Sequence, residues 1–291
     1  MKIAFVILQY KAVEETKKCV DSIRKFIDTD EYSIIIVDNN SPDDSYDVIC
    51  RYCGESKDVV ILKSNENLGF AKGNNLGFMY AKNTLHAQFI AMINNDTALF
   101  QSGFYETIKH KYDECKYAVM GPMIVTNDGS ITSNPLGTKD TYRNENDVNK
   151  LIKLNKIRIF MAKTRLIHIY ELFKKIKSKK ENNAEMYSHD WFNIRLHGAA
   201  WIFSPEYIEK FDGLDSRTFM YGEEMFLQLH VLKNNMKMLY SPELVIFHKE
   251  DASTDSTLGK TTKKRLFIYE NNIKSETLYL EALKEYSEKK I

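Results

Sequence analysis

The stretch Ser33-Ile34-Ile35-Ile36-Val37-Asp38-Asn39-Asn40 changes from apolar to strongly polar at a single position. A continuous apolar run of this kind is typical of a strand that is covered on both faces of a parallel sheet. Two further runs have the same character: Ile3–Leu8, which ends at Gln9, and Phe89–Ile93, which ends at Asn94. Each of these three predicted strands therefore has a polar cluster at its carboxyl end.

Segments with helical spacing of apolar residues separate these strands. They span residues 13–27, 45–53 and about 70–82, and the apolar run Val59–Leu62 predicts one more strand. The resulting β-α-β-α-β-α-β order predicts an α/β fold in which crossover helices flank a mostly parallel sheet. Because ligands bind at the carboxyl ends of strands in such sheets, the three polar clusters predict a binding site along one edge.

The rest of the chain predicts a less regular arrangement. Residues 134–146 lack periodicity and are expected to form a loop. The expected strands or extended pieces span residues 118–125, 198–203, 238–240 and 242–247, and the expected helices span residues 206–211, 223–234 and 263–284.

Composition argues against several classes of protein. The 291 residues carry a formal net charge of +1, which gives no indication of a nucleic-acid partner. There is no run of about 18 apolar residues, so we expect no transmembrane helix, and the apolar N-terminus is interpreted as a first strand. Cys50 and Cys53 lack partners at zinc-ligand spacing and are expected to be two thiols on one helix in a reducing cytoplasm. Neither a Walker A motif nor a G-x-G-x-x-G motif is present.

Several short motifs in a fixed order carry a resemblance to a known family. They are Val37-Asp38-Asn39-Asn40-Ser41-Pro42-Asp43, Asn67-Leu68-Gly69-Phe70-Ala71-Lys72-Gly73-Asn74-Asn75, Asn94-Asn95-Asp96-Thr97, Gly213-Leu214-Asp215, Phe219-Met220-Tyr221-Gly222-Glu223-Glu224, Pro242 and His248. Over residues 1 to about 250 this order resembles the inverting family 2 glycosyltransferases of the GT-A fold, particularly the rhamnosyl- and galactofuranosyltransferase-like branch.

The resemblance implies an α/β fold of the GT-A type and a division of the chain into three parts. Residues 1–125 would form the nucleotide-sugar-binding half, residues 126–250 the acceptor-binding half, and residues 251–291 a C-terminal helical segment. The implied activity is hexosyltransferase-like. A sugar would pass with inversion from a UDP- or dTDP-sugar to a hydroxyl of a glycan or lipid-linked acceptor, in cell-surface polysaccharide synthesis. Assembly into a homo-oligomer is left open.

The resemblance also implies a cation, because a departing diphosphate needs positive charge that Mg²⁺ or Mn²⁺ usually supplies. The D-x-D motif of the family reads Asn94-Asn95-Asp96 here, and Asp96 matches its last acid. His248 matches a histidine that completes the metal site in some relatives. Asn94 departs from the family pattern and lowers the negative charge of the expected site.

The remaining site residues are assigned in the same way. Asp38 matches the carboxylate that holds the base or ribose of the nucleotide, and Gln9 and Asn94 lie at neighbouring strand ends. Lys72 is a candidate for the diphosphate, with a solvated helix lysine as the alternative. An inverting transferase needs a base that deprotonates the acceptor hydroxyl, and Glu224 stands in the place of that base with Glu for Asp.

Residues 150–180 form a separate electrostatic feature. They contain eleven Lys or Arg residues and one acid, Glu171, so the segment is strongly basic while the rest of the chain, whose total with it is +1, must be net acidic. Apolar residues recur through it at roughly helical spacing. Basic amphipathic helices bind anionic membrane surfaces, so we expect peripheral attachment to the inner face of the cell membrane. Packing of the apolar side on the domain or on a second subunit is the alternative.

Two other functions stay open. A nucleotidyltransferase would usually carry a glycine-rich phosphate loop after the first strand, but Gln9-Tyr10-Lys11-Ala12-Val13 contains no glycine. A non-catalytic sugar-nucleotide-binding protein would fit the weakened D-x-D motif, although Asp96, Glu224 and His248 argue against it.

Overall fold

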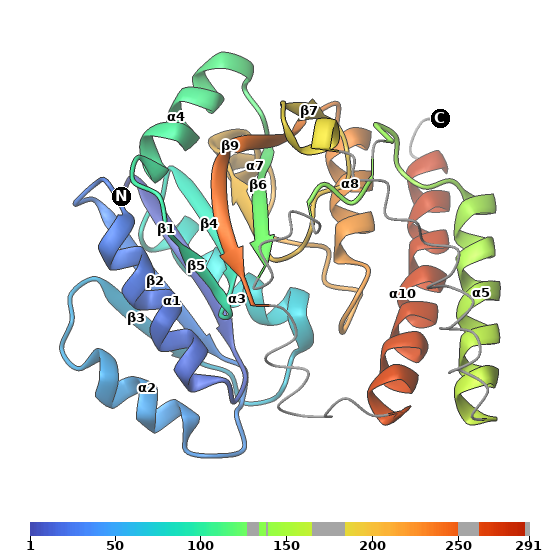
Figure 1. Cartoon of the computed structure of the whole chain (residues 1–291), viewed down its shortest axis with the longest axis horizontal. Coiled ribbons are helices and arrows are strands. Elements are labelled where there is room, and N and C mark those ends of the chain that lie inside the picture. The colour runs from blue at the N-terminus through green and yellow to red at the C-terminus, as the bar shows by residue number, and fades with distance from the viewer. Residues whose placement is uncertain (127–133, 138, 165–183, 250–261, 289–291) are drawn as a thin grey trace.

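The structure is a computed structural model that describes residues 1–126, 134–137, 139–164, 184–249 and 262–288 (Figure 1). Its first third contains β1 (Ile3–Gln9), α1 (Val13–Phe26), β2 (Tyr32–Asp38), α2 (Ser45–Cys53), β3 (Val59–Lys63), α3 (Gly69–Asn83) and β4 (Phe89–Asn94). Strand β1 pairs in parallel with both β2 and β4, and β2 pairs in parallel with β3. The predicted order of strands and crossover helices is confirmed.

The rest of the chain adds five strands to the same sheet. The further elements are β5 (Thr97–Leu99), α4 (Phe104–Cys115), β6 (Val119–Thr126), α5 (Glu145–Lys163), a 3-10 helix (Ala184–Tyr187), β7 (Trp191–Phe192), β8 (Ala200–Phe203), α7 (Pro205–Lys210), α8 (Glu223–Lys233), β9 (Met238–His248) and α10 (Thr262–Glu288). The strand order in the sheet is β3-β2-β1-β4-β8-β6-β9-β5, and β7 pairs with β9. Strand β8 runs antiparallel to β4 and β6, while β9 runs parallel to β6.

Three features differ from the sequence-based expectation. The two extended pieces at 238–240 and 242–247 are one strand, β9, whose pairing register with β6 shifts between Pro122 and Met123. Helix α4 and the three-residue strand β5 were not predicted. Helix α5 begins at Glu145, inside the expected loop, where the Asn144 side chain caps it by accepting from Asp147 N.

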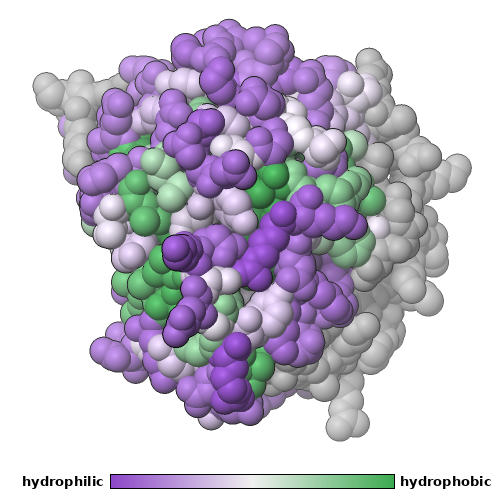
Figure 2. All heavy atoms as spheres, turned by 90° about the vertical axis from the view of Figure 1, so that its left-hand side faces the viewer, coloured by the Kyte–Doolittle hydropathy of each residue, from purple (hydrophilic) through white to green (hydrophobic). Residues whose placement is uncertain are grey.

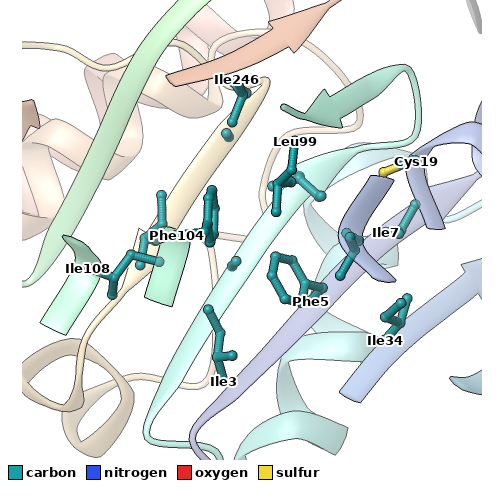
Figure 3. Packing of buried hydrophobic residues seen from close by; sticks show 14 of the residues in the cluster. Ile3, Phe5, Ile7, Cys19, Ile34, Leu99, Phe104, Ile108 and Ile246 are labelled. Atoms are coloured by element: carbon teal, nitrogen blue, oxygen red, sulfur yellow. The ribbon is translucent and has the colours of Figure 1, made fainter. Parts of the chain in front are cut away.

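Two apolar layers explain the continuous apolar run of β1. Its alternate residues Ile3, Phe5 and Ile7 belong to one apolar cluster with residues of α1, α2 and α4. Figure 3 shows part of this cluster, including Cys19 of α1 and Phe104 of α4. The intervening residues Ala4 and Val6 pack on the other face, against α3, α7 and α8. A strand with both faces covered has no polar position to offer solvent, so its polar groups appear only where it ends.

Helices α5 and α10 lie side by side at one end of the molecule (Figure 1). A small cluster of Val148, Phe226, Leu229, Tyr279 and Ala282 joins them to α8. Helix α5 covers residues 150–163 of the basic segment, and the remainder up to residue 180 falls almost entirely outside the described residues. No helix within the described ranges is long and apolar enough to cross a membrane.

The opposite side of the molecule has a different surface. Figure 2 shows the side of α1 and α2, which is mainly hydrophilic with small scattered apolar patches. By contrast, α5 exposes Ile157 and Phe160.

Candidate active site

The carboxyl ends of β1, β2 and β4 meet at one edge of the sheet, because these parallel strands are in register. Gln9 lies opposite Asp38, and the neighbouring Leu8 lies opposite Asn94. Strand β9 brings His248 opposite Thr97, the first residue of β5. The polar strand ends that the sequence analysis singled out are thus gathered at one edge.

Asp96 and His248 are in direct contact. The Nε2 atom of His248 lies 3.2 Å from the Oδ1 atom of Asp96, and both residues are buried, at 5% and 8% exposure. The backbone of the next residue reinforces the contact, since Lys249 N donates to Asp96 O at 3.0 Å. The turn after β4 and the end of β9 therefore join the two residues that the resemblance implies as metal ligands.

Of the donor atoms of this pair, the carboxylate oxygen suits a hard divalent cation, whereas an imidazole nitrogen suits transition metals better than Mg²⁺. Mg²⁺ binds about 2.1 Å from each ligand in octahedral geometry, which places adjacent ligand atoms about 3 Å apart. A carboxylate oxygen and an imidazole nitrogen at 3.2 Å agree with that spacing. The described part of the chain holds no group of three or more Asp, Glu, His or Cys side chains that could bind a metal. A cation here would need further oxygen ligands from water and from substrate phosphates.

The two asparagines before Asp96 differ in what they contact. Asn95 is buried, and its Nδ2 donates to Ala12 O at 3.3 Å and to Thr16 Oγ1 at 3.1 Å, so it fixes the turn to α1. Asn94 closes the turn through its backbone, whose carbonyl oxygen accepts from Thr97 Oγ1 at 2.6 Å. Its half-buried side chain makes no hydrogen bond to the described residues, so it can turn toward a ligand.

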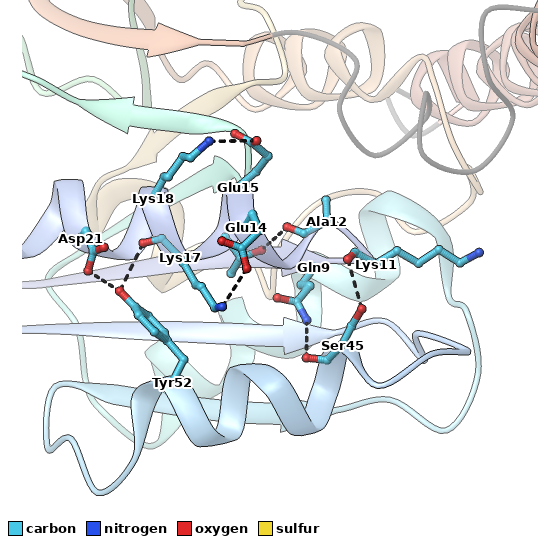
Figure 4. A network of polar contacts seen from close by, with 11 residues as sticks. Gln9, Lys11, Ala12, Glu14, Glu15, Lys17, Lys18, Asp21, Ser45 and Tyr52 are labelled. Atoms are coloured by element: carbon cyan, nitrogen blue, oxygen red, sulfur yellow. Dashed lines mark hydrogen bonds and ion pairs between the residues drawn. The ribbon is translucent and has the colours of Figure 1, made fainter.

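Asp38 is held by the turn that follows it. Its carboxylate accepts from Ser41 N at 3.1 Å and from Ser41 Oγ at 2.7 Å, and Gln9 Nε2 lies 3.4 Å from its Oδ1. Gln9 also donates to Ser45 O at the start of α2 (Figure 4). Within the described ranges, the buried Gln9 Oε1 has no hydrogen-bond partner. Gln9 and Asp38 are therefore in contact, and the carboxylate of Asp38 is turned into the protein.

Lys72 does not join these residues. Its side chain is exposed on α3 and forms no hydrogen bond or ion pair with any described residue. The start of α3 is instead held by Asn39, whose Nδ2 donates to Gly69 O at 3.1 Å and whose Oδ1 accepts from Leu68 N at 2.9 Å.

The start of α3 also holds the loop that carries the acidic pair. Phe70 N donates to Phe219 O at 2.7 Å. Gly69 has φ +76°, and a Cβ atom there would lie 2.1 Å from Phe219 O, so only glycine permits this approach. Residues 218–222 are thereby fixed to the half of the sheet that contains Asp38.

Glu223 and Glu224 begin α8 in different environments. Glu223 is buried, and its Oε1 accepts from Thr218 Oγ1 at 2.9 Å. Burial, and then the negative charge of Glu224, raise the pKa of Glu223 to about 7. Glu224 is half-buried, and a Cβ atom on Gly198 would lie 3.1 Å from its Oε1. Of the two acids, Glu224 is the more exposed.

The sequence analysis did not identify His197. Its ring centroid lies 5.7 Å from that of His248, and its Nδ1 accepts from Ala199 N at 3.1 Å, which assigns the proton of a neutral ring to Nε2. Strand β8 is antiparallel to β4 and starts where β4 ends, since Ile93 lies opposite Ala200. The available signal was a polar residue just before the predicted strand 198–203. It points to the site only once β8 is known to run antiparallel to β4.

Comparison with known proteins gives two matches in sequence. The family model described as Glycosyl transferase family 2 matches residues 5–176. The low-salt glycan biosynthesis hexosyltransferase Agl10 of Haloferax volcanii is 20% identical over 237 residues, which cover 81% of this chain and 63% of Agl10.

Solved structures of TarS from S. aureus share the fold. The crystal structure of TarS 1-349 has a TM-score of 0.53 and 12% identity, and the match covers 86% of this chain and 60% of that one. The structure of the same TarS fragment in complex with UDP has a TM-score of 0.54, with 12% identity and the same coverage. This chain thus spans less than two thirds of the length of these relatives. Together with the family match, the likeness establishes the α/β, GT-A type fold.

Proposed function

This chain belongs to glycosyl transferase family 2, and from that premise we propose that it is an inverting sugar transferase that uses a nucleotide diphosphate sugar. The observation that carries the proposal is the contact between Asp96 and His248 at the carboxyl edge of the sheet. The turn at His197 and Gly198 lies between this pair and Glu224, because His197 faces His248 and Gly198 faces Glu224. Asp96 and His248 would thus hold a cation for the leaving diphosphate on one side of this turn, and Glu224 would act as the base on the other side. This arrangement suits transfer of a sugar from a diphosphate.

The donor in this proposal is a UDP- or dTDP-sugar. TarS has been crystallised with UDP and with UDP-GlcNAc, which supports a uridine nucleotide for this chain as the first choice. Agl10 is named a hexosyltransferase, which supports a hexose. We assign the chain to the rhamnosyl- and galactofuranosyltransferase-like branch on the motifs that it carries. The acceptor is a hydroxyl of a glycan or a lipid-linked glycan in polysaccharide synthesis.

Asp96 and His248 would hold Mg²⁺ or Mn²⁺ together with the diphosphate of the donor. The bound cation would neutralise the negative charge that develops on the leaving diphosphate. Gln9 and Asp38 would orient the nucleotide at the ends of β1 and β2. Asn94, whose side chain makes no hydrogen bond to the described residues, would contact the diphosphate, and the exposed Lys72 would turn toward it from the first turn of α3.

Glu224 would remove the proton from the acceptor hydroxyl as this oxygen attacks the anomeric carbon. The hydroxyl would approach along the side of Gly198, where the absence of a side chain leaves room beside the carboxylate. Glu223 would be protonated below about pH 7, because burial and the charge of Glu224 raise its pKa to about 7. Residues 1–125 would thus serve the donor and residues 126–250 the acceptor, with residues 251–291 as a helical extension.

Peripheral binding to the inner face of the cell membrane forms part of the proposal. From Lys150 to the end of α5, the exposed residues fall on one stripe at helical spacing: Lys150, Lys153, Lys156, Ile157, Phe160 and Lys163. Lysines that flank exposed apolar side chains suit an anionic lipid surface, which such a helix enters only to the depth of the headgroups. The competing occupant of this stripe is a second copy of the chain in a homo-oligomer.

One experiment separates this function from its two alternatives, a nucleotidyltransferase and a non-catalytic binding protein. First, thermal unfolding is measured with UDP, dTDP and GDP, each with and without Mn²⁺. Then the sugar derivative of the nucleotide that stabilises the chain most is supplied as the donor, and its turnover is monitored through the nucleoside diphosphate that is released. We expect stabilisation by UDP that requires Mn²⁺, because the ligand binds only the folded state. Release of inorganic pyrophosphate in a parallel assay with a nucleoside triphosphate and a sugar 1-phosphate would indicate a nucleotidyltransferase. Stabilisation without any release, with a panel of glycan acceptors present, would indicate a binding protein.

A further inference from the structure

Asn39 joins the carboxyl end of β2 to the turn that begins α3. It is almost fully buried, with 3% exposure, and its backbone N donates to Gln9 O at 2.9 Å. Its side-chain Nδ2 donates to Asn67 Oδ1 and to Gly69 O, each at 3.1 Å, and its Oδ1 accepts from Leu68 N at 2.9 Å. Both N–H groups and the carbonyl oxygen of the amide are thus used. The strand ends that we assign to the donor and the start of α3 are therefore fixed to each other through one side chain.

The start of α3 in turn holds the segment that leads to the assigned base. Residues 218–222, which we call the base loop, run directly into α8, whose second residue is Glu224. Phe70 N donates to Phe219 O at 2.7 Å, and Gly69 permits this approach because a Cβ atom there would lie 2.1 Å from the same oxygen. A path of direct contacts thus runs from the end of β2 to the loop before the base.

The base loop is closed on itself and packed on α10. Thr218 Oγ1 donates to Glu223 Oε1 at 2.9 Å, and both residues are buried, at 2% and 6% exposure. On its other side, Ser275 Oγ lies 3.5 Å from Met220 O, and a Cβ atom on Gly222 would lie 3.0 Å from Ser275 Cβ. Because a loop held in this way moves as a unit, we expect a displacement where it meets α3 to displace the first turn of α8 as well.

We propose that Asn39 is a positioning residue that sets the carboxylate of Glu224 relative to the bound donor. The inference rests on the proposed function, in which Glu224 deprotonates the acceptor. An in-line attack needs the base, the hydroxyl and the anomeric carbon in one geometry, and a misplacement of about 1 Å can lower a rate about 100-fold. Asn39 would touch none of the reacting atoms and would act through the base loop alone.

The alternative is that Asn39 only stabilises the packing of α3 on the sheet. That helix has a separate anchor, however, because Asn75 Nδ2 donates to Leu214 O and Leu214 N donates to Asn75 Oδ1, both at 2.8 Å. A Cβ atom on Gly77 would lie 2.5 Å from Val6 Cγ1, so α3 also packs closely on β1. The helix is therefore held without Asn39, and the hydrogen bonds of the Asn39 side chain are confined to the turn at its start.

The test compares turnover with UDP binding in two variants that break the path at different points. Asn39→Ala removes all three side-chain hydrogen bonds, and Gly69→Ala places a methyl group against Phe219 O. Each should lower kcat about 10- to 100-fold and leave the Kd of UDP unchanged. Asn75→Ala is the matched control, because it removes an asparagine that anchors the same helix elsewhere, and its kcat should stay at the wild-type level.

A double-mutant cycle separates positioning of the base from a general loss of structure. In the Glu224→Gln background, Asn39→Ala should cause no further decrease of kcat, because the base through which Asn39 acts is absent. A decrease by the same factor in both backgrounds would overturn the proposal, and so would wild-type kcat in both Asn39→Ala and Gly69→Ala. If Asn39→Ala folds poorly, Gly69→Ala takes its place in the cycle.

Hydrogen exchange tests the path without any turnover. The amides of Phe70 and of the base loop should exchange faster in Asn39→Ala than in the wild type or in Asn75→Ala, because the contact between α3 and the loop is loosened. Unchanged protection of these amides would contradict the proposal. Absence of transfer by the wild type with every donor, or full turnover of Glu224→Gln, would instead count against the proposed function. The exchange measurement would then still decide whether Asn39 holds the base loop.

Discussion

The Nε2 atom of His248 lies 3.2 Å from the Oδ1 atom of Asp96, and each residue reaches this contact from a different strand end. The backbone bond from Lys249 N to Asp96 O holds the two chain segments together at the same point. The side chains are thereby positioned by the sheet itself, which is how a site can be ready before its ligand arrives.

The first prediction concerns the cation. Asp96→Ala should reduce sugar transfer at least about 100-fold, because it removes the carboxylate that we assign as a ligand. It should also abolish the Mn²⁺-dependent stabilisation by UDP. Asp44→Ala is the control, since Asp44 is an exposed acid near the same edge whose side chain caps nothing. Full activity of the variant, or of the wild type in EDTA, would show that the assignment is wrong.

The second prediction concerns the base. Glu224→Gln keeps the shape of the side chain and removes its basicity, so turnover should fall about 10²–10⁴-fold while UDP affinity stays the same. Glu223→Gln should have the milder effect, because the buried Glu223 is bonded to Thr218. Steady-state rates of both variants, measured with the same donor and acceptor, decide between them. The reverse order would identify Glu223 as the base.

The third prediction is a pH dependence of stability. The pKa of Glu223 is raised from 4.5 to about 7, so the folded chain keeps a proton that the unfolded chain loses. The contribution of Glu223 to the free energy of unfolding is therefore fully present below about pH 4.5. It decreases as the pH rises to about 7, by up to about 3 kcal/mol. Glu223→Gln should remove this component.

Urea unfolding of wild type and Glu223→Gln between pH 4.5 and pH 8 measures that component as the difference between two curves. The free energy of unfolding of the variant, relative to that of the wild type, should increase as the pH rises to about 7. Above about pH 7 the difference between the two should stay constant. Glu66→Gln, a change at an exposed acid, should give no such difference. Curves that stay parallel throughout would mean that Glu223 titrates normally.

The fourth prediction concerns the α5 stripe. Wild-type protein should co-sediment with vesicles that contain anionic lipid, and less so at high salt. Ile157→Ser combined with Phe160→Ser should weaken this binding about tenfold or more, because it removes the apolar side chains that would enter the headgroup region. Phe100→Ser is the control, since Phe100 is exposed elsewhere on the molecule. Unchanged vesicle binding, or variants that instead lose self-association in sedimentation velocity, would contradict membrane attachment.

Much of the fold was predictable because local sequence patterns, such as apolar runs and helical spacing of apolar residues, indicate its strands and helices. The apolar runs of β1, β2 and β4 and their polar ends follow from a strand with both faces covered. The pairing of Asp96 with His248 followed from the resemblance alone, because nothing local in the sequence says that β9 lies beside β5. Strand β5 has three residues and only β9 as a neighbour, so its existence depends on a distant partner.

The site was also predictable only where it depends on local sequence, and not where it depends on tertiary contacts. His197 became visible only when β8 was seen to run against β4, and the contrast between Glu223 and Glu224 depends on tertiary burial. Lys72 was singled out from its motif, yet its side chain stays in solvent.

The position of β9 between β6 and β5 has a consequence for biosynthesis. A ribosome completes β1 to β6 well before it reaches Met238, so during that interval β5 lacks its strand neighbour and Asp96 lacks His248. Chains fold from the N-terminus as they emerge. The nascent protein can therefore form its first strands and bring Gln9 and Asp38 together before the contact between Asp96 and His248 can form. We expect a chain stalled before residue 248 to be catalytically silent, so that donor sugar is not consumed until the last strand is in place.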